Sequence, residues 1–204
     1  MGPVELASSS FGQTFNVTPI QMLTAVSACV NGGYLVKPHL VEKMLDEDGK
    51  IVSTTDTGYK RQVISESTSK KLCELMEYVA ENGAKNALVP GYKIGAKTGT
   101  SQKVSKIQAT GDSYLYIGSC ITVAPADDPE IAVLVMLDEP KGDKYYGGVI
   151  SAPVNGKVMT DILPYLGYEP SYTEEELKNL AVTVPELVGS TVTADKRGAG
   201  CKHS

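Results

Sequence analysis

The sequence predicts an α+β fold in which an antiparallel sheet is flanked by helices. Residues 18–33 and 65–83 each carry apolar side chains at helical spacing, between a hydroxyl residue that can cap a helix and a glycine that can end one. Three strand-like stretches follow one another between residues 92 and 138. The last two are joined by only five residues, 125–129, which predicts an antiparallel hairpin.

The first predicted helix begins at Thr18, which can cap it, with Pro19 at the first helical position. Its apolar positions and its stop are Ile20, Leu23, Val26, Val30 and the pair Gly32-Gly33. Residues 34–43 then alternate like a strand, and the acidic turn at 46–49 predicts a hairpin into residues 50–54.

The second predicted helix covers about residues 65–82 and stops at Gly83. The stripe expected to be buried consists of Leu72, Leu75, Met76 and Val79. The three strands follow at about 92–103, 114–124 and 130–138.

A last helix is predicted over residues 149–166, with Pro164 expected to kink or fray its final turn. One side of this helix carries Val154, Val158, Ile162 and Leu166. The composition then changes: residues 169–176 are polar and acidic, and residues 182–189 resemble the first strand of another module. We therefore divide the chain into a main domain at 1–168, a linker at 169–181 and a short C-terminal segment at 182–204, which is too short for a core of its own.

Composition and charge exclude several classes of protein. The 204 residues are 42% hydrophobic and 21% charged, which is typical of a globular chain. A formal net charge of −5 without any block of like charges argues against a nucleic-acid partner and against a polybasic membrane anchor. The longest apolar run, residues 131–137, is too short to cross a bilayer, and residues 1–10 lack the basic start and apolar stretch of a signal peptide.

Cysteine and histidine give no sign of a metal or a cofactor. The four cysteines, at positions 29, 73, 120 and 201, are far apart and do not form any CxxC pair, and the two histidines are His39 and His203. Three of the cysteines lie in apolar surroundings, where a free cysteine behaves as a small hydrophobic side chain. We expect neither a metal nor a cofactor.

The most informative run is Lys97-Thr98-Gly99-Thr100 with Ser101 behind it. On a strand, Lys97, Gly99 and Ser101 point to one face, and the two threonines point to the other. Because Gly99 has no side chain, the backbone of a ligand can approach the strand closely. An ammonium group and hydroxyl donors at this strand predict binding of a carboxylate, although a single triplet also fits a strand with a solvated lysine.

Residues 91–98 also come close to the phosphate-binding pattern G-x-x-x-x-G-K-[ST]. Ala96 stands where the second glycine is needed to wrap the backbone around a phosphate. A strand-like sequence follows the motif instead of a helix, so the context disfavours a nucleotide site.

The run Lys97-Thr98-Gly99-Thr100 resembles the third signature of the penicillin-binding proteins, the serine-type enzymes of peptidoglycan cross-linking. The resemblance extends in consistent order over about residues 6–168 and is closest to the class B, monofunctional members. The further stretches that carry it are residues 12–13, 16–22, 31–40, 124–129, 138–141, 145–148 and 152–154.

The resemblance implies an antiparallel sheet flanked by helices, as in the penicillin-binding protein and serine β-lactamase fold. It implies that Lys97 shapes the field around a nucleophile, and that Thr98 and Thr100 bind the carboxylate of a D-Ala-D-Ala stem peptide or of a β-lactam. The backbone N–H of Thr100 would supply half of an oxyanion hole, a type of donor that can contribute on the order of 3 kcal/mol. The substrate-binding set is thus Lys97, Thr98, Gly99 and Thr100, with Lys97 and Thr100 also catalytic.

The resemblance also extends to the tail and to location. Residues 184–192 are similar to the opening of a PASTA repeat, which some class B proteins carry after the transpeptidase domain. From Ala194 onward the likeness fades. Class B proteins are held at the outer face of the cytoplasmic membrane by an N-terminal helix, so the resemblance implies an extracytoplasmic location for the parent protein, in division, elongation or sporulation.

Two family motifs are absent or misplaced. The chain contains no S-x-N, and its one S-x-x-K, at Ser67 and Lys70, is predicted to lie on the solvent-facing side of an amphipathic helix. A catalytic serine needs a positioned base in a sheltered site, so Ser67 fits capping or solubility better. We expect the C-terminal portion of a transpeptidase domain, incomplete at its N-terminal side and inactive alone, which pairs with that N-terminal part or with itself.

Two other functions remain open from the sequence. The chain could be a non-catalytic module that binds peptidoglycan fragments through its PASTA-like tail. It could also be a β-lactamase-like serine hydrolase that uses Ser67, which the missing S-x-N disfavours.

Overall fold

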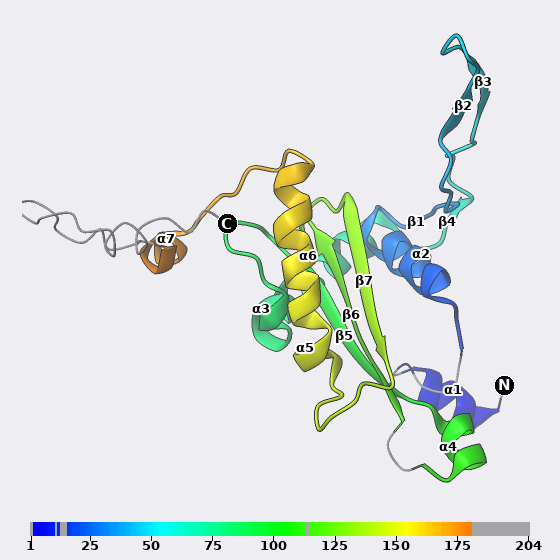
Figure 1. Cartoon of the computed structure of the whole chain (residues 1–204), viewed down its shortest axis with the longest axis vertical. Coiled ribbons are helices and arrows are strands. Elements are labelled where there is room, and N and C mark those ends of the chain that lie inside the picture. The colour runs from blue at the N-terminus through cyan, green and yellow to red at the C-terminus, as the bar shows by residue number, and fades with distance from the viewer. Residues whose placement is uncertain (1, 11, 13–15, 113–114, 181–204) are drawn as a thin grey trace, which may run out of the picture. The chain divides into compact units, whose positions relative to one another are not determined.

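A computed structural model describes residues 2–10, 12, 16–112 and 115–180 (Figure 1). The chain separates into two compact units, one up to Tyr172 and one from Thr173 onward. Of the second unit the structure describes the short helix α7 (Glu174–Leu180), which lies in the predicted linker at 169–181. The PASTA-like residues 182–204 lie outside the described residues.

The first unit is built on a three-stranded antiparallel sheet in the order β5–β6–β7. Its strands are β5 (Gly95–Gln102), β6 (Tyr116–Ala124) and β7 (Ile131–Asp138). Thr98 lies opposite Cys120, and Cys120 lies opposite Val135, so the register is set across the whole sheet. The three predicted strands and the antiparallel hairpin after Ala124 are confirmed.

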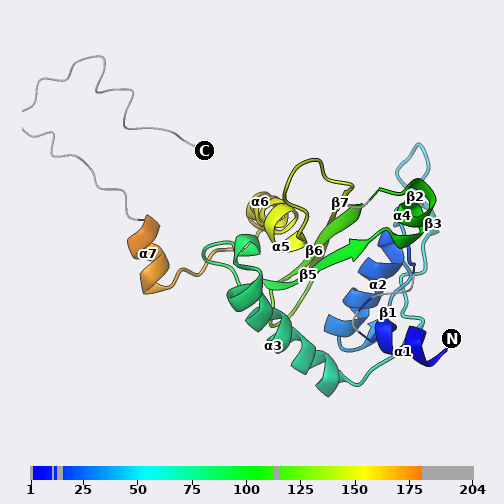
Figure 2. The ribbon, with the colours of Figure 1, turned by 90° about the horizontal axis from the view of Figure 1, so that it is seen from below.

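Helices cover both faces of this sheet (Figure 2). One face carries α2 (Pro19–Val30) and α3 (Glu66–Gly83), and a Cβ placed on Gly95 would lie 3.2 Å from Cβ of Met76 in α3. The other face carries α5 (Gly147–Ile150) and α6 (Ala152–Tyr165), and a Cβ on Gly118 would lie 2.7 Å from the side chain of Ile150. The predicted α+β architecture is confirmed.

The core consists of a cluster of small side chains around the start of β5 and a cluster of larger ones around the residues just before it. The small cluster consists of Ala80, Ala84, Ala87, Ala96, Cys120 and Ala152. The larger cluster consists of Val89, Ile94, Ala124, Met159 and Leu163, and a third cluster joins Val30, Cys73 and Val123 between α2, α3 and β6. Alanines at the interface let α3 and α6 approach the strands closely, which fixes the helices against β5 and β6.

Local capping explains why the predicted starts of α2 and α3 are accurate, whereas the single helix predicted over residues 149–166 is divided into α5 and α6. The hydroxyl of Thr18 accepts a hydrogen bond from the Gln21 N–H (3.3 Å), and the Gln21 side chain accepts one from the Thr18 N–H (2.8 Å), which makes a capping box at the start of α2. At α3 the Ser65 hydroxyl accepts a hydrogen bond from the Thr68 N–H (3.2 Å). The predicted end of α3 at Gly83 is confirmed.

The predicted buried face of α3 is wrong in part, and the buried face of α6 is not the side that carries Val154 and Leu166. In α3, Leu75 is 49% exposed, whereas Ser69 and Cys73 are buried. Val154 in α6 and Leu166 just after it are exposed, and the buried residues of α6 are Ala152, Asn155, Gly156, Met159 and Leu163. Which face of a helix is buried depends on what it packs against. Small and polar side chains of α6 face the backbone of β6, and the spacing of apolar residues along one helix does not predict such a contact.

The predicted strand at 34–43 is mostly wrong. Within residues 34–42 only β1 (Tyr34–Leu35) is a strand, and its partner β4 (Arg61–Gln62) is equally short. The predicted hairpin after it is confirmed, as β2 (Lys43–Leu45) paired with β3 (Ile51–Thr54).

Three further helical segments were not expected from the sequence: α1 (Pro3–Ser9), the 3₁₀ turn η1 (Lys85–Ala87) and α4 (Val104–Thr110). Pro164 does lie in the last turn of α6. Among the described helices, none has the length and apolar character needed to cross a membrane.

Candidate functional site

The predicted site residues form the centre of strand β5. Lys97, Thr98, Gly99 and Thr100 lie opposite Ile121, Cys120, Ser119 and Gly118 of β6 in an unbroken register. Because no bulge interrupts this pairing, their side chains alternate between the two faces of the sheet.

The backbone hydrogen bonds show which groups of β5 are available to a ligand. The Lys103 N–H donates to the Leu115 carbonyl (2.9 Å), and in an antiparallel ladder such bonded residues recur at every second position. Residues 97, 99 and 101 therefore pair with β6, whereas the N–H and C=O groups of Thr98 and Thr100 point away from β6. No other strand of the described residues pairs with that edge of β5.

Thr98 and Thr100 face the start of α5. The Gly147 N–H donates a hydrogen bond to the hydroxyl oxygen of Thr100 (3.2 Å). A hydroxyl has two acceptor lone pairs and one O–H, so this contact fixes the oxygen and leaves the O–H free to donate to a ligand. A Cβ placed on Gly148 would lie 3.5 Å from Cγ2 of Thr98, so both threonines line the same face.

Lys97 and Gly99 lie on the opposite face of β5. The side chain of Lys97 is exposed, and its ammonium donates to the Thr98 carbonyl oxygen (2.7 Å), which places the charge beside the unpaired edge of β5. A Cβ on Gly99 would lie 2.7 Å from the Ser119 hydroxyl oxygen. On this face the Ser119 side chain therefore lies where a Cβ of residue 99 would be, and close approach of a ligand backbone at Gly99 stays a prediction.

Two buried polar side chains, one just before α6 and one in its first turn, anchor the strand behind the threonines. The Ser151 hydroxyl donates to the Gly118 carbonyl (2.9 Å), and the Asn155 amide donates to the Cys120 carbonyl (2.7 Å). Burial raises the pKa of the Cys120 thiol, so Cys120 stays neutral and structural. These bonds hold β6, and with it β5, against α5 and α6.

A second feature beside the threonines was not expected from the sequence. The rings of Tyr116 and Tyr145 stack with centroids 4.1 Å apart, and Tyr146 packs on Tyr145 at 4.4 Å. A hollow of about 360 Å³ lies here, and its lining consists of Tyr116, Pro140, Gly142, Asp143 and Tyr145. The adjacent tyrosines 145 and 146 were a sequence signal, but their contact with Tyr116 depends on the fold.

The alternative sites do not form. Residues 95–102 are a strand, so Lys97 does not stand at the start of a helix as a phosphate-binding loop requires. Ser67 is exposed in the first turn of α3, with its hydroxyl 3.0 Å from that of Ser65, and Lys70 is exposed as well. Within the described residues there is no group of three or more histidine, cysteine or acidic side chains that could hold a metal ion.

The fold and the residues of β5 together indicate the protein family. Residues 3–160 match the family described as the penicillin-binding protein transpeptidase domain, and the chain belongs to that family. A solved structure supports the same architecture: the transpeptidase domain of penicillin-binding protein 3 from Burkholderia pseudomallei aligns with a TM-score of 0.67 at 28% identity, over 85% of this chain and 50% of that one.

Among individual proteins, the chain is similar to stage V sporulation protein D of Bacillus subtilis, with 42% identity over 95% of this chain and 31% of that protein. It is also similar to the peptidoglycan D,D-transpeptidase FtsI of Escherichia coli, with 34% identity over 82% of this chain and 26% of that protein. The chain therefore spans about a third or less of the length of these relatives.

Proposed function

We propose that this chain provides the carboxylate-binding strand of a peptidoglycan D,D-transpeptidase. The observation that carries the proposal is the unpaired edge of β5, to which the backbone groups of Thr98 and Thr100 point, with the Lys97 ammonium beside it. An extended peptide can pair with such an edge by main-chain hydrogen bonds. The fixed ammonium and hydroxyl donors then suit a terminal carboxylate.

Each residue of the strand has a role in this proposal. Thr98 and Thr100 donate to the carboxylate of a stem peptide ending in D-Ala-D-Ala, or to that of a β-lactam. Lys97 adds the positive field, and Gly99 lets the ligand backbone approach. The N–H of Thr100 stabilises the oxyanion of the acyl-transfer step, an interaction that acts only when charge develops there.

The nucleophile belongs, in this proposal, to a part of the domain outside this chain. This fits the absence of S-x-N from the sequence and the exposed position of Ser67. We infer that the chain does not cross-link peptidoglycan alone and that it acts with the preceding part of the same domain, on the extracytoplasmic side of the membrane. The PASTA-like tail and a role in division or sporulation, the latter suggested by the 42% identity to a sporulation protein, belong to the same proposal.

Nuclear magnetic resonance of the ¹⁵N-labelled chain tests the binding role. N-acetyl-D-Ala-D-Ala is expected to shift the amides of residues 97–100, whereas the same dipeptide with a C-terminal amide in place of the carboxylate leaves them unchanged. Lys97→Met should abolish the shifts. Lys93→Met is the matched control, because Lys93 lies outside β5 and its ammonium pairs with Asp127 (2.7 Å). Equal shifts with the blocked dipeptide, or normal binding by Lys97→Met, would refute the proposal.

Intact mass after incubation with a penicillin tests the absence of a nucleophile. We expect no adduct. A stable adduct that peptide mapping places on Ser67, and that Ser67→Ala removes, would make the chain a serine enzyme in its own right.

A further inference from the structure

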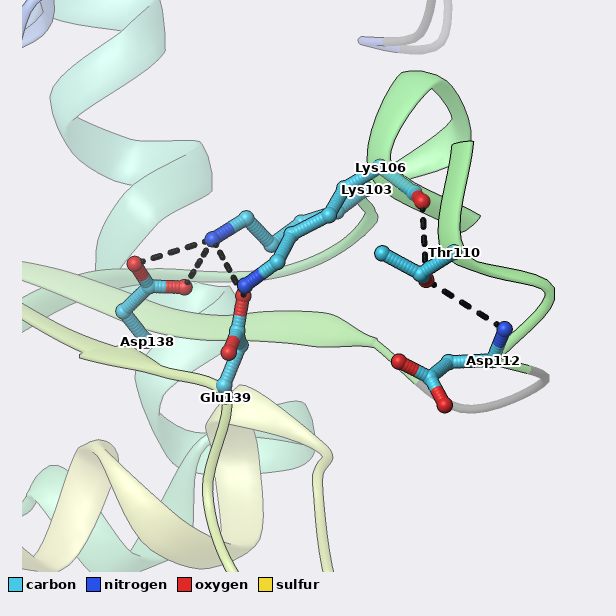
Figure 3. Close-up of polar contacts among 6 residues, drawn as sticks. All are labelled: Lys103, Lys106, Thr110, Asp112, Asp138 and Glu139. Carbon is cyan, nitrogen blue, oxygen red and sulfur yellow. Dashed lines mark hydrogen bonds and ion pairs between the residues drawn. The ribbon is translucent and has the colours of Figure 1, made fainter. Parts of the chain in front are cut away.

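Four charged side chains meet where β5 and β7 end (Figure 3). The Lys103 ammonium contacts both carboxylate oxygens of Asp138 (2.9 and 3.1 Å) and Oε1 of Glu139 (2.7 Å). The Lys106 ammonium donates to the same Glu139 oxygen. Two positive and two negative groups balance, and we call this set, Lys103, Lys106, Asp138 and Glu139, the strand-end cluster.

The strand-end cluster is more constrained than an ordinary surface ion pair. The side chains of Lys103 and Glu139 are only 24% and 23% exposed. Hydrogen bonds from Lys103 and Lys106 lower the pKa of the Glu139 carboxyl to about 2, so it stays ionised. Glu139 also has a φ of 49°, a left-handed conformation that residues other than glycine rarely adopt and that persists when surrounding contacts impose it.

The cluster joins segments that are not neighbours in the sheet. Lys103 directly follows β5 and bonds to Leu115 through its backbone, while the Glu139 N–H donates to the Tyr116 carbonyl (2.9 Å). The Lys103 side chain thus reaches across the start of β6 to the end of β7. Lys106 lies in α4, so the cluster also ties α4 to the end of β7.

The loop that follows Glu139 leads back to the proposed site. Its far end is Gly147, whose N–H donates to the Thr100 hydroxyl (3.2 Å). Just before that end, Tyr145 stacks on Tyr116. The loop is therefore held at Glu139 by two lysines and at Gly147 by the threonine that we propose binds the carboxylate.

We propose that the strand-end cluster positions this loop, so that Glu139 acts through Gly147 as a positioning residue for the Thr100 hydroxyl. The ion pairs fix where the loop leaves β7, and the loop in turn fixes the Gly147 N–H that orients Thr100. The link to carboxylate binding rests on the function proposed above, whereas the placement of Gly147 does not depend on it.

Hydrogen exchange on the ligand-free chain tests the positioning directly. Glu139→Gln keeps the shape of the side chain and removes its charge. We expect exchange of the Gly147 amide to speed up by about fivefold or more, while amides in the middle of β6 keep their rates because only local opening changes. The control is Asp127→Asn, which breaks an ion pair of similar length (2.7 Å) elsewhere and should leave the Gly147 amide unchanged.

A charge exchange separates positioning from a general loss of structure. In the quadruple variant Lys103→Glu, Lys106→Glu, Asp138→Lys and Glu139→Lys, every ion pair of the cluster is reversed in sign and each still joins opposite charges. We expect this variant to recover most of the slow exchange that Glu139→Gln loses. Unchanged Gly147 exchange in Glu139→Gln, uniform acceleration of all amides, or failure of the charge exchange to restore protection would overturn the positioning proposal.

Titration with N-acetyl-D-Ala-D-Ala then measures the consequence for binding. Glu139→Gln is expected to weaken binding by about three- to tenfold, and the charge exchange to restore it. If the unmodified chain does not bind the dipeptide, the proposed function fails, but the ligand-free exchange still decides the positioning proposal. If it binds and Glu139→Gln binds equally well, the link from Glu139 to Thr100 is wrong.

Discussion

Replacing Gly147 by alanine tests how closely α5 must approach the strand that carries the candidate site. A Cβ at this position would lie 2.1 Å from the Ser119 carbonyl oxygen and 2.3 Å from the Gly99 carbonyl oxygen. Both are backbone atoms, so neither can rotate away, and α5 must move off the sheet. Gly148 is the matched control, because its added Cβ would meet only Thr98 Cγ2 at 3.5 Å and the Gly83 carbonyl at 3.9 Å.

The two variants are expected to change the free energy of unfolding in different directions. Alanine in place of glycine stabilises a helix by about 0.5–1 kcal/mol when the space is free, so Gly148→Ala should be neutral or slightly stabilising. In Gly147→Ala the forced backbone shift costs about 1–3 kcal/mol, and loss of the hydrogen bond to Thr100 adds roughly 1 kcal/mol. We expect Gly147→Ala to lower the free energy of unfolding by about 2–3 kcal/mol overall.

Urea denaturation followed by circular dichroism measures both free energies, and the Thr100 amide shift reports the local change. Gly147→Ala should displace the Thr100 amide resonance, and Gly148→Ala should leave it in place. Equal stability of the two alanine variants, with an unmoved Thr100 resonance, would refute the close approach of α5 to β5.

Two further predictions concern buried and partly buried polar groups. The buried Ser69 hydroxyl accepts a hydrogen bond from the Gly32 N–H (3.0 Å), so Ser69→Ala should lower the free energy of unfolding by about 1–3 kcal/mol because it leaves that donor unpaired. Replacing the exposed Ser67 by alanine should change the free energy of unfolding by no more than about 0.5 kcal/mol. Similar losses from both variants in urea denaturation would contradict this prediction. Because Lys103 and Lys106 lower the pKa of Glu139 to about 2 from its ordinary 4.5, its contribution to stability is complete above about pH 4.5 and is lost as the pH falls toward 2. Thermal unfolding across this range should show a smaller acid-induced loss of stability in Glu139→Gln than in the unmodified chain. An identical pH profile in the two proteins would exclude Glu139 as the origin of this loss.

Some features follow from the sequence because they depend on neighbouring residues alone. Thr18-Pro19 and Ser65 set the starts of α2 and α3, and the acidic turn at 46–49 sets the β2–β3 hairpin, because caps and turns are local interactions. The run from Lys97 to Thr100 indicated the strand and the family, because the types and order of its residues can be read without knowing the fold.

Other features required the tertiary structure. The exposure of Leu75 and the burial of Ser69 depend on which face of α3 packs against Gly32 and the sheet. The sequence does not determine this face, because more than one face of the helix is compatible with the spacing of its residues. Residues 36–42 alternate like a strand but lack a paired strand in the structure, and strand formation depends on pairing.

The sequence by itself determined which chemical groups this protein carries and in what local order: one lysine, two threonines and a glycine on a single strand. Only the tertiary structure decided which of their backbone groups face the unpaired edge of β5, and that Gly147 binds Thr100 from 47 residues away. It also decided that Lys103 meets Glu139, 36 residues further on. Such contacts join distant segments, and their geometry is set by sheet register and helix packing rather than by any local pattern.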